Sequence, residues 1–215
     1  MVPQRVLLYH ITHVKNLASI MQSGGLHAYN GLRQGSIDYT NIAYQHIQDR
    51  RASKSVPCGP CGTLHDYVPF YFAPRSPMLH TINQGNIPGY AERQQPVIHL
   101  VTSLEEIVAK GVQFVFSDGH GTMELTEFFD DITLLDRIDW QVMRSRYWFD
   151  TDDEPDRKRR RQAEFLIHAF VPWELIIGIG VIDQEIKTRV EQHLQASQHK
   201  PLVKVLPEWY YEVKV

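Results

Sequence analysis

The chain opens with a β-type run that leads directly into a short amphipathic helix. Residues 8–13 have the sequence Leu-Tyr-His-Ile-Thr-His, and the apolar residues Leu17, Ile20 and Met21 follow at helical spacing. We expect the helix to end at Gly24, because glycine adopts the left-handed conformation that closes a helix. This unit places polar side chains at the end of a strand, beside a pocket whose floor is the next helix.

Length and composition predict one globular domain over residues 1–215. The chain has 215 residues, of which 43% are hydrophobic and 22% charged, enough to bury a substantial core. No apolar run is long enough to cross a membrane, and the N-terminus lacks the pattern of a signal peptide. We therefore expect a soluble, cytoplasmic protein with no membrane partner. The net charge of −3 argues against a surface that is basic all over, but local Lys and Arg clusters leave room for a nucleic-acid partner.

Short β-rich runs alternate with helical stretches along the rest of the chain. The expected strands cover residues 68–72, 96–101, 114–116, 165–171 and 176–182. The expected helices cover residues 104–110, 123–132 and 184–194. The acids of residues 123–132 would form a solvated face, and we assign them no chemistry. The alternation, without a repeat or a linker, predicts an α+β fold in which helices flank a split sheet of mixed and antiparallel strands.

A further helix is expected from Thr40 to Arg51, and it carries an arginine on its apolar face. Tyr44, Ile47 and Arg51 fall at positions i, i+3 and i+7, whereas Arg50 points away. A buried guanidinium stays protonated and therefore needs an anion as its partner. That anion is a substrate, a phosphate or a carboxylate of the protein itself, so a catalytic role and a structural ion pair are both open.

The most hydrophilic segment covers residues 150–161 and joins acidic to basic side chains. It ends in a basic run of five residues: Arg157, Lys158, Arg159, Arg160 and Arg161. This composition is typical of a solvated, mobile loop. The segment leads directly to Glu164, which stands at the start of an apolar strand.

Cys58 and Cys61 have the spacing of a redox motif, but their context differs from that of redox cysteines. A redox pair normally opens a helix directly after a strand, where the helix N-terminus lowers the thiol pKa. Here prolines and glycines surround both residues, and a strand is expected next. We expect a loop with two incidental thiols. A zinc site that includes His65 is an alternative, although structural zinc needs four ligands.

Five motifs together resemble the DarT family of DNA ADP-ribosyltransferase toxins. They are Leu-Tyr-His-Ile-Thr-His at residues 8–13, Gln-Asp-Arg-Arg at 48–51, Asp-Tyr-Val-Pro-Phe-Tyr-Phe at 66–72, Pro-Arg-Ser-Pro-Met-Leu at 74–79 and Gln-Ala-Glu-Phe-Leu at 162–166. The resemblance implies an ADP-ribosyltransferase fold and transfer of ADP-ribose from NAD to a thymine base in single-stranded DNA. It also implies a monomeric bacterial toxin whose partner is a DarG-like macrodomain antitoxin that removes the mark.

The resemblance also implies which residues bind NAD. His10 and Thr12 would hold the NAD ribose, and Tyr71 and Met78 would line the nicotinamide pocket. His120, in a Gly-His-Gly motif, would lie near the cofactor, although such a motif can also be an ordinary tight turn. The reaction requires no metal.

Glu164 would be the essential carboxylate, and Arg51 would take the second catalytic role. Breaking the nicotinamide–ribose bond builds positive charge on the ribose, and a carboxylate that binds the ribose hydroxyls stabilises that charge selectively in the transition state. A guanidinium with a pKa above about 12 is a poor base. We therefore expect Arg51 to stabilise the thymine anion, with Glu164 or water accepting the imide proton. On spacing alone, Glu164 also fits a solvated strand edge.

Binding of single-stranded DNA requires cations and aromatic stacking surfaces. We expect the cations from Arg75 and the basic run Arg157–Arg161. Stacking surfaces are expected from Tyr39, Tyr44 and Trp148. The acids before the basic run can instead neutralise it, and the aromatic residues can belong to the core.

Other functions stay open from the sequence. One is an ADP-ribosyltransferase that acts on guanine, RNA or protein. RNA 2′-phosphotransferases share the Leu-Tyr-His opening and use NAD, but they need additional basic residues for the 2′-phosphate. A non-catalytic module that binds NAD or nucleic acid is a third possibility, against which the presence of both Arg51 and Glu164 argues.

Overall fold

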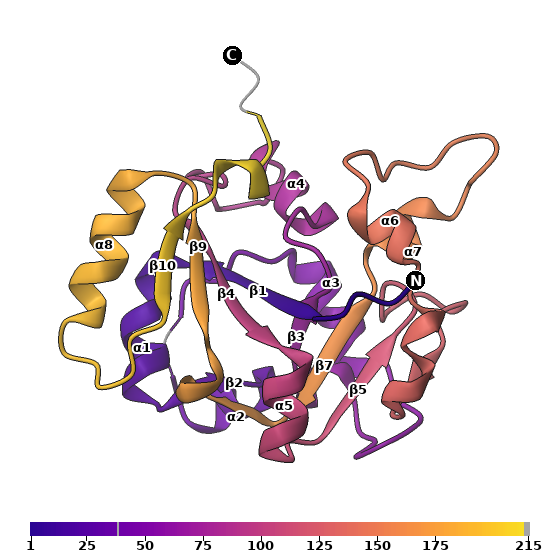
Figure 1. Cartoon of the computed structure of the whole chain (residues 1–215), viewed down its shortest axis with the longest axis horizontal. Coiled ribbons are helices and arrows are strands. Elements are labelled where there is room, and N and C mark those ends of the chain that lie inside the picture. The colour runs from indigo at the N-terminus through magenta and orange to yellow at the C-terminus, as the bar shows by residue number, and fades with distance from the viewer. Residues whose placement is uncertain (38, 213–215) are drawn as a thin grey trace.

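One eight-stranded mixed sheet forms the centre of the computed structural model, which describes residues 1–37 and 39–212 (Figure 1). The strand order is β10-β9-β4-β1-β3-β7-β5-β6. The strands are β1 Leu7–His13, β3 Tyr67–Tyr71, β4 Val97–Ser103, β5 Phe114–Ser117, β6 Phe128–Phe129, β7 Glu164–His168, β9 Gly178–Val181 and β10 Leu202–Val205. β9 and β10 run parallel, and the other described pairings are antiparallel. The predicted α+β fold with a mixed sheet is confirmed.

The sheet is split beside its central strand. β1 pairs with β4 along its whole length, but its pairing with β3 is limited to Tyr9 opposite Tyr71. Pro69 in β3 has no N–H to donate to a ladder. Its carbonyl oxygen instead lies 2.8 Å from Nδ1 of the His10 ring. The His10 side chain of β1 thus binds the Pro69 carbonyl of β3 at a point where the two strands have no backbone pairing.

The strand expected over residues 165–171 is divided in two. β7 ends at His168, and β8 (Phe170–Pro172) pairs with β2 (Gly25–His27) in a separate two-stranded sheet. Ala169 between them has a φ of +59°, a left-handed conformation that interrupts an extended strand. The expectation of one continuous strand is therefore wrong.

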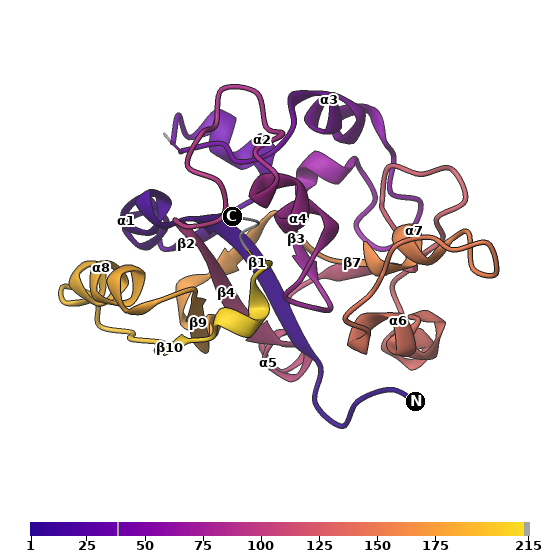
Figure 2. The same cartoon turned by 90° about the horizontal axis from the view of Figure 1, so that it is seen from above.

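Helices cover both faces of the main sheet. α2 and α3 lie on one side and α5 on the other (Figure 2). The helices are α1 Leu17–Gln22, α2 Tyr29–Gln34, α3 Gln45–Ser53, α4 Pro77–Asn83, α5 Leu104–Lys110, α6 Trp140–Arg144, α7 Arg157–Arg161 and α8 Gln184–Leu194. The predictions of α1, α5 and α8 are confirmed, and the buried side chains of α8 are Ile186, Val190 and Leu194.

Two helix predictions fail because distant residues compete for the backbone. α3 begins at Gln45 and not at Thr40, because the Asn16 side chain binds both the N–H (2.7 Å) and the carbonyl (3.0 Å) of Thr40. Residues 123–132 contain β6 and no α-helix, because Phe128 and Phe129 pair with β5. Their apolar residues have helical spacing, but the backbone of Phe128 and Phe129 pairs with β5 at the edge of the sheet instead.

The segment with both cysteines is a loop, and its packing gives no sign of redox activation. Cys58 is half-buried and packs against a small apolar cluster, and burial raises the pKa of its thiol. Cys61 is exposed, and its carbonyl accepts a hydrogen bond from the Tyr67 hydroxyl at 2.7 Å. His65 faces Gln48 (3.1 Å) and does not complete a metal site with the thiols. The next element is a 3-10 turn over residues 64–66 and not a strand.

Candidate active site

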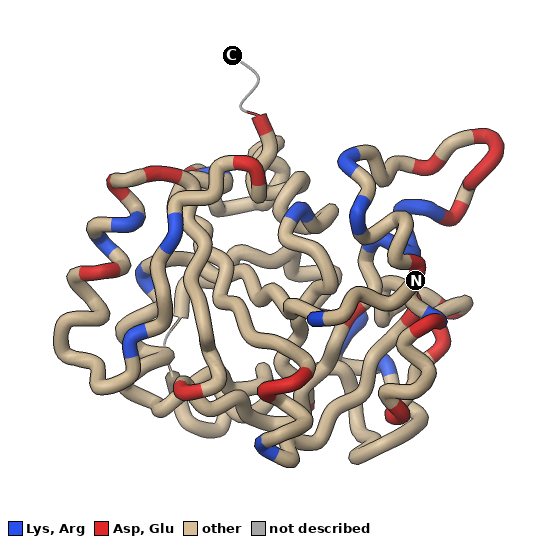
Figure 3. Tube along the Cα trace, viewed as in Figure 1, with Lys and Arg blue, Asp and Glu red and all other residues tan. Residues whose placement is uncertain are grey.

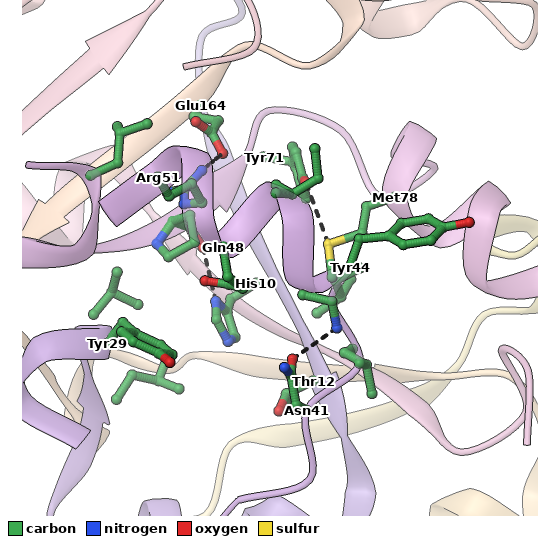
Figure 4. Close-up of a pocket in the computed structure, with 18 of the residues that line it drawn as sticks. His10, Thr12, Tyr29, Asn41, Tyr44, Gln48, Arg51, Tyr71, Met78 and Glu164 are labelled. Atoms are coloured by element: carbon green, nitrogen blue, oxygen red, sulfur yellow. Dashed lines mark hydrogen bonds and ion pairs between the residues drawn. The ribbon is translucent and has the colours of Figure 1, made fainter. Parts of the chain in front are cut away.

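The first residue of β7 and the second half of α3 meet in a buried ion pair (Figure 4). Arg51 Nη1 lies 2.7 Å from Glu164 Oε1, and the two side chains are 8% and 4% exposed. A buried charge needs a partner, and here the opposite charges of the two side chains partner each other. The anion that the sequence required for Arg51 is thus the carboxylate that the sequence singled out as catalytic.

Each side chain of the ion pair has a second polar atom that its partner does not bind. Glu164 Oε2 accepts a hydrogen bond from the Gly121 N–H at 3.3 Å. Arg51 Nη2 is buried and has no hydrogen-bond partner among the described residues. An unpaired buried donor costs about 1–3 kcal/mol, so a substrate oxygen at this point would recover a missing hydrogen bond.

His120 and Gly121 form a turn over the carboxylate. A Cβ atom at Gly121 would lie 2.6 Å from Glu164 Oε2, so only glycine lets the backbone approach this closely. The Nδ1 atom of the His120 ring lies 2.9 Å from the Thr122 hydroxyl and 3.2 Å from the Thr122 N–H. Burial lowers the pKa of His120 and Glu164 opposes this effect, so the ring is neutral at pH 7.

The pair lies in a cavity of about 570 Å³ that the split of the sheet opens beside β1. The same cavity is lined by His10 and Thr12 from β1, Tyr71 from β3 and Met78 from α4. Burial lowers the pKa of His10, so its ring is neutral and is held through Nδ1 by the Pro69 carbonyl. One cavity therefore brings together the residues that the sequence proposed for NAD binding and for catalysis.

The side chains at the cavity wall are held in place by hydrogen bonds. Asn16 Nδ2 donates to the Thr12 hydroxyl at 3.0 Å (Figure 4). The Tyr71 hydroxyl donates to Met78 Sδ at 3.7 Å. Burial, together with the charge of Glu164, raises the pKa of Tyr71, so the phenol stays protonated. This part of the wall is thus formed by neutral groups that lie near the charged Arg51–Glu164 pair.

The basic run forms helix α7, and the expectation of a mobile loop is wrong there. Three of its arginines bind carboxylates of the protein: Arg157 binds Glu154, Arg159 binds Asp118 and Asp156, and Arg160 binds Asp139 and Glu154. Asp118 and Asp139 lie outside the charged segment, so the fold and not the local sequence decides these pairs. The structure favours the neutralisation that the sequence left open.

Arg161 is the most buried residue of the run, at 4% exposed. Its guanidinium donates to the backbone carbonyls of Val142, Met143 and Ser145 at 2.6–3.0 Å, and to that of Arg75. Burial lowers the pKa of Arg161 to about 10, so it remains charged at pH 7. All three nitrogens of this side chain are bound to backbone carbonyls of the protein, which argues against the predicted DNA contact.

Lys158 differs from its four neighbours. It is exposed, it lines the cavity, and no carboxylate of the described chain binds its ammonium group. Arg75 lies 4.5 Å above the Tyr211 ring, with its Nε buried. Of the predicted stacking residues, Tyr39 and Tyr44 line the cavity, but Trp148 is only 2% exposed.

The comparisons with known proteins agree with this geometry. The family model described as ssDNA thymidine ADP-ribosyltransferase, DarT, matches residues 9–211. The chain belongs to the DarT family. A relative from Thermus aquaticus, named a DNA ADP-ribosyl transferase, is 42% identical over 215 residues, which cover 99% of this chain and 92% of the relative.

Solved DarT structures show the same architecture. A structure of Thermus sp. 2.9 DarT in complex with ADP-ribosylated ssDNA has a TM-score of 0.92 and 39% identity, and the match covers 98% of this chain and 99% of that one. The same protein in complex with NAD+ gives a TM-score of 0.87 at 36% identity, over 98% and 100% of the two chains. A fusion of a DNA ADP-ribosyl transferase with a DNA ADP-ribosyl glycohydrolase, from Thermosipho africanus, is 24% identical over 89% of this chain and 46% of the fusion.

Two further observations concern this DarT chain as a whole. None of the described helices has the length and apolar character that a membrane span requires. Within residues 1–37 and 39–212, no three His, Cys, Asp or Glu side chains gather in a way that could hold a metal ion.

Sequence reasoning missed the groups that position the DarT active site. Gly121 binds Glu164 through its backbone, and the Ser117 hydroxyl accepts the Glu164 N–H at 3.2 Å. Asn16 fixes both Thr12 and the chain before α3. The pair of glycines around His120 was a usable signal for a close backbone approach. Ser117 and Asn16 carried none.

Proposed function

We propose that this protein transfers ADP-ribose from NAD to a thymine base of single-stranded DNA. One observation carries the proposal: a buried carboxylate and a guanidinium with one unpaired donor meet in a cavity large enough for a dinucleotide fragment and open to solvent. Membership of the DarT family supports the choice of donor and acceptor. The 1–215 chain would act as a single ADP-ribosyltransferase domain.

The donor half of the cavity would bind NAD through neutral side chains. His10 has its Nε2 free for a ribose hydroxyl, because Nδ1 is used by Pro69, and Thr12 follows on the same face of β1. Tyr71 and Met78 would pack against the nicotinamide ring, and His120 would approach the cofactor from the opposite turn. NAD serves as a substrate in this scheme, and no metal takes part.

Glu164 would drive departure of nicotinamide. The bond between the ribose C1′ and the nicotinamide nitrogen breaks, its electrons leave with nicotinamide, and positive charge develops on the ribose. A carboxylate hydrogen-bonded to the ribose hydroxyls stabilises that charge more in the transition state than in the bound substrate. The contacts of Glu164 with Arg51 and Gly121 fix the carboxylate for this task before NAD arrives.

Arg51 would act on the acceptor base. The thymine imide nitrogen attacks C1′ and loses its proton, so negative charge develops on the neighbouring carbonyl oxygens. Arg51 Nη2 is the unpaired donor nearest to Glu164 and would bind one of these oxygens. The proton passes to Glu164 or to water, because the guanidinium is already protonated.

The DNA strand would approach from the side of Lys158 and Arg75, because the other predicted cations are either bound to carboxylates of the described chain or, in the case of Arg161, buried against backbone carbonyls. The protein would act as a monomeric toxin in the bacterial cytoplasm, where NAD and DNA are both present. Its antagonist would be a macrodomain antitoxin of the DarG type. The Thermosipho africanus fusion supports this pairing of a transferase with a glycohydrolase.

The direct test is to incubate the protein with NAD and a randomised pool of single-stranded DNA, and to weigh the DNA by mass spectrometry. An ADP-ribose adduct on thymine that is absent with Glu164→Gln would support the proposal and give the sequence motif. Nicotinamide release without modified DNA would point to RNA or protein as the acceptor. No turnover with any acceptor would favour a binding module.

A further inference from the structure

A pair of stacked aromatic rings stands in the segment between α6 and α7 and lines the same cavity as the candidate NAD-binding residues of β1. The Trp148 and Phe149 rings are 4.2 Å apart and inclined by 24°. Trp148 is 2% exposed, whereas Phe149 is 50% exposed, so one ring is buried beneath the other. Phe149 therefore offers apolar ring surface to solvent at the cavity, backed by a buried aromatic ring.

The pair is held rigidly. The Trp148 indole N–H donates to the Tyr211 hydroxyl at 2.8 Å, and the carbonyl of the preceding residue, Tyr147, accepts from Arg157 Nη2 at 2.8 Å. The His80 ring meets the Phe149 ring edge-on at 5.4 Å. A ring that is already fixed loses little conformational entropy when a ligand stacks on it.

The exposed ring lies on the route to the reacting atoms. Phe149, Lys158, Gln162 and Glu164 line one continuous cavity. Lys158 is the exposed cation of α7, and no carboxylate of the described chain binds its ammonium group, whereas Arg161, which also lacks a carboxylate partner, is buried against backbone carbonyls. Several acids of the same segment lie toward its outer tip (Figure 3), and Glu154 and Asp156 bind arginines of α7. An aromatic face beside a free cation is the combination that binds single-stranded nucleic acid.

We infer that Phe149 is the stacking platform for a base that neighbours the modified thymine, with Lys158 binding the phosphate between them. The inference rests on the proposed function and adds how the acceptor strand is held. Trp148 supports the platform from below and does not touch the DNA. Stacking is tolerant of base identity, so Phe149 would contribute affinity and register, while sequence selectivity would come from other contacts.

The test combines protein variants with abasic sites in the DNA. Phe149→Ala is expected to raise the KM for a thymine-containing oligonucleotide by roughly 5- to 100-fold, as loss of one stacked base does. Phe149→Trp should retain a low KM. Tyr147→Ala is the matched control, because Tyr147 is 73% exposed but does not line the cavity. The control should leave the KM for DNA unchanged.

An abasic site next to the target thymine should raise the KM of the unmodified enzyme at one flanking position. In Phe149→Ala the same abasic site should have no further effect, because the ring and the base are two halves of one contact. Effects that multiply would overturn the inference. A raised KM for NAD in DNA-free nicotinamide release by Phe149→Ala would also overturn it, since the ring would then belong to the donor site. If the unmodified enzyme modifies no DNA at all, the proposed function itself fails.

Discussion

Arg51 and Arg161 are buried almost equally, at 7% and 4% exposed, yet their surroundings differ in kind. Arg161 directs all of its donors at backbone carbonyls of the protein, and it ties α7 to α6. Arg51 faces a carboxylate on one side and nothing on the other, because its Nη2 has no partner among the described residues. Burial of a charged side chain therefore does not mark a functional site by itself. What distinguishes Arg51 is a buried N–H donor without a partner next to one that binds a carboxylate.

The largest effect should come from removing the charge of Glu164. In Glu164→Gln the ribose charge loses its stabilising carboxylate, and we expect ADP-ribosyl transfer to fall by at least about 100-fold. Arg51 also keeps a buried charge without an anion, so the unfolding free energy should fall by about 3 kcal/mol. Mass spectrometry of the DNA and denaturant titration measure the two effects. Full activity of this variant would refute the assigned role.

The second largest effect should come from replacing the planar guanidinium of Arg51 with another cationic group. Arg51→Lys retains a cation for Glu164, but its single nitrogen cannot occupy the two separate positions that Nη1 and Nη2 hold in the planar guanidinium. We expect transfer to thymine to fall by about 100-fold, while DNA-free nicotinamide release falls much less. The ratio of the two rates is the measurement. Equal losses in both assays would place Arg51 in NAD cleavage and not at the acceptor base.

Arg161 should give the opposite result. Arg161→Met removes the donors that bind the carbonyls at the end of α6 and that of Arg75, and we expect the unfolding free energy to fall by about 3 kcal/mol. The kcat of the folded fraction should be unchanged, because no donor of Arg161 faces the cavity. Thermal unfolding and active-site titration separate the two quantities. A selective loss of DNA binding in the folded protein would restore the predicted DNA contact.

The smallest effect should come from protonation of His120, a titratable ring beside the Arg51–Glu164 pair. Its pKa is lowered from 6.5 by burial, so the ring binds a proton only in more acidic solution than the unfolded chain does. Stability should therefore decrease as the pH falls below 6.5. Activity should decrease in the same range, because a second cation would weaken the pair. His120→Asn should flatten this acid limb, and a pH profile that keeps its shape would contradict the assignment.

Local sequence patterns predicted the helices whose buried residues recur at regular spacing along the chain. The spacing of Ile186, Val190 and Leu194 defined α8, and the spacing of Tyr44, Ile47 and Arg51 placed Arg51 on a buried face. Where a distant group supplies the hydrogen bonds, the same reasoning failed. Asn16 delays the start of α3, and β5 draws Phe128 and Phe129 into the sheet.

The candidate site was predictable in part for the same reason. Glu164, Arg51 and His10 stand in recognisable motifs, but the pairing of Glu164 with Arg51 joins residues far apart in the chain. The basic run illustrates the limit most clearly. Its local composition predicts a solvated loop, whereas Asp118 and Asp139, from other parts of the chain, turn it into a neutralised helix. Only the fold reveals that no carboxylate of the described chain binds the Lys158 ammonium group.

The close approach of Gly121 to Glu164 also bears on how such a protein is lost in evolution. Any side chain at residue 121 would intrude on the Glu164 carboxylate at 2.6 Å, whereas the buried Leu64 side chain, at 3.1 Å, would need to give way by only a few tenths of an ångström. Many single-nucleotide changes convert a glycine codon, so this position offers an accessible route to an inactive but folded protein. In cells that carry a harmful copy without an antagonist, we expect surviving lineages to accumulate replacements here more often than in the core.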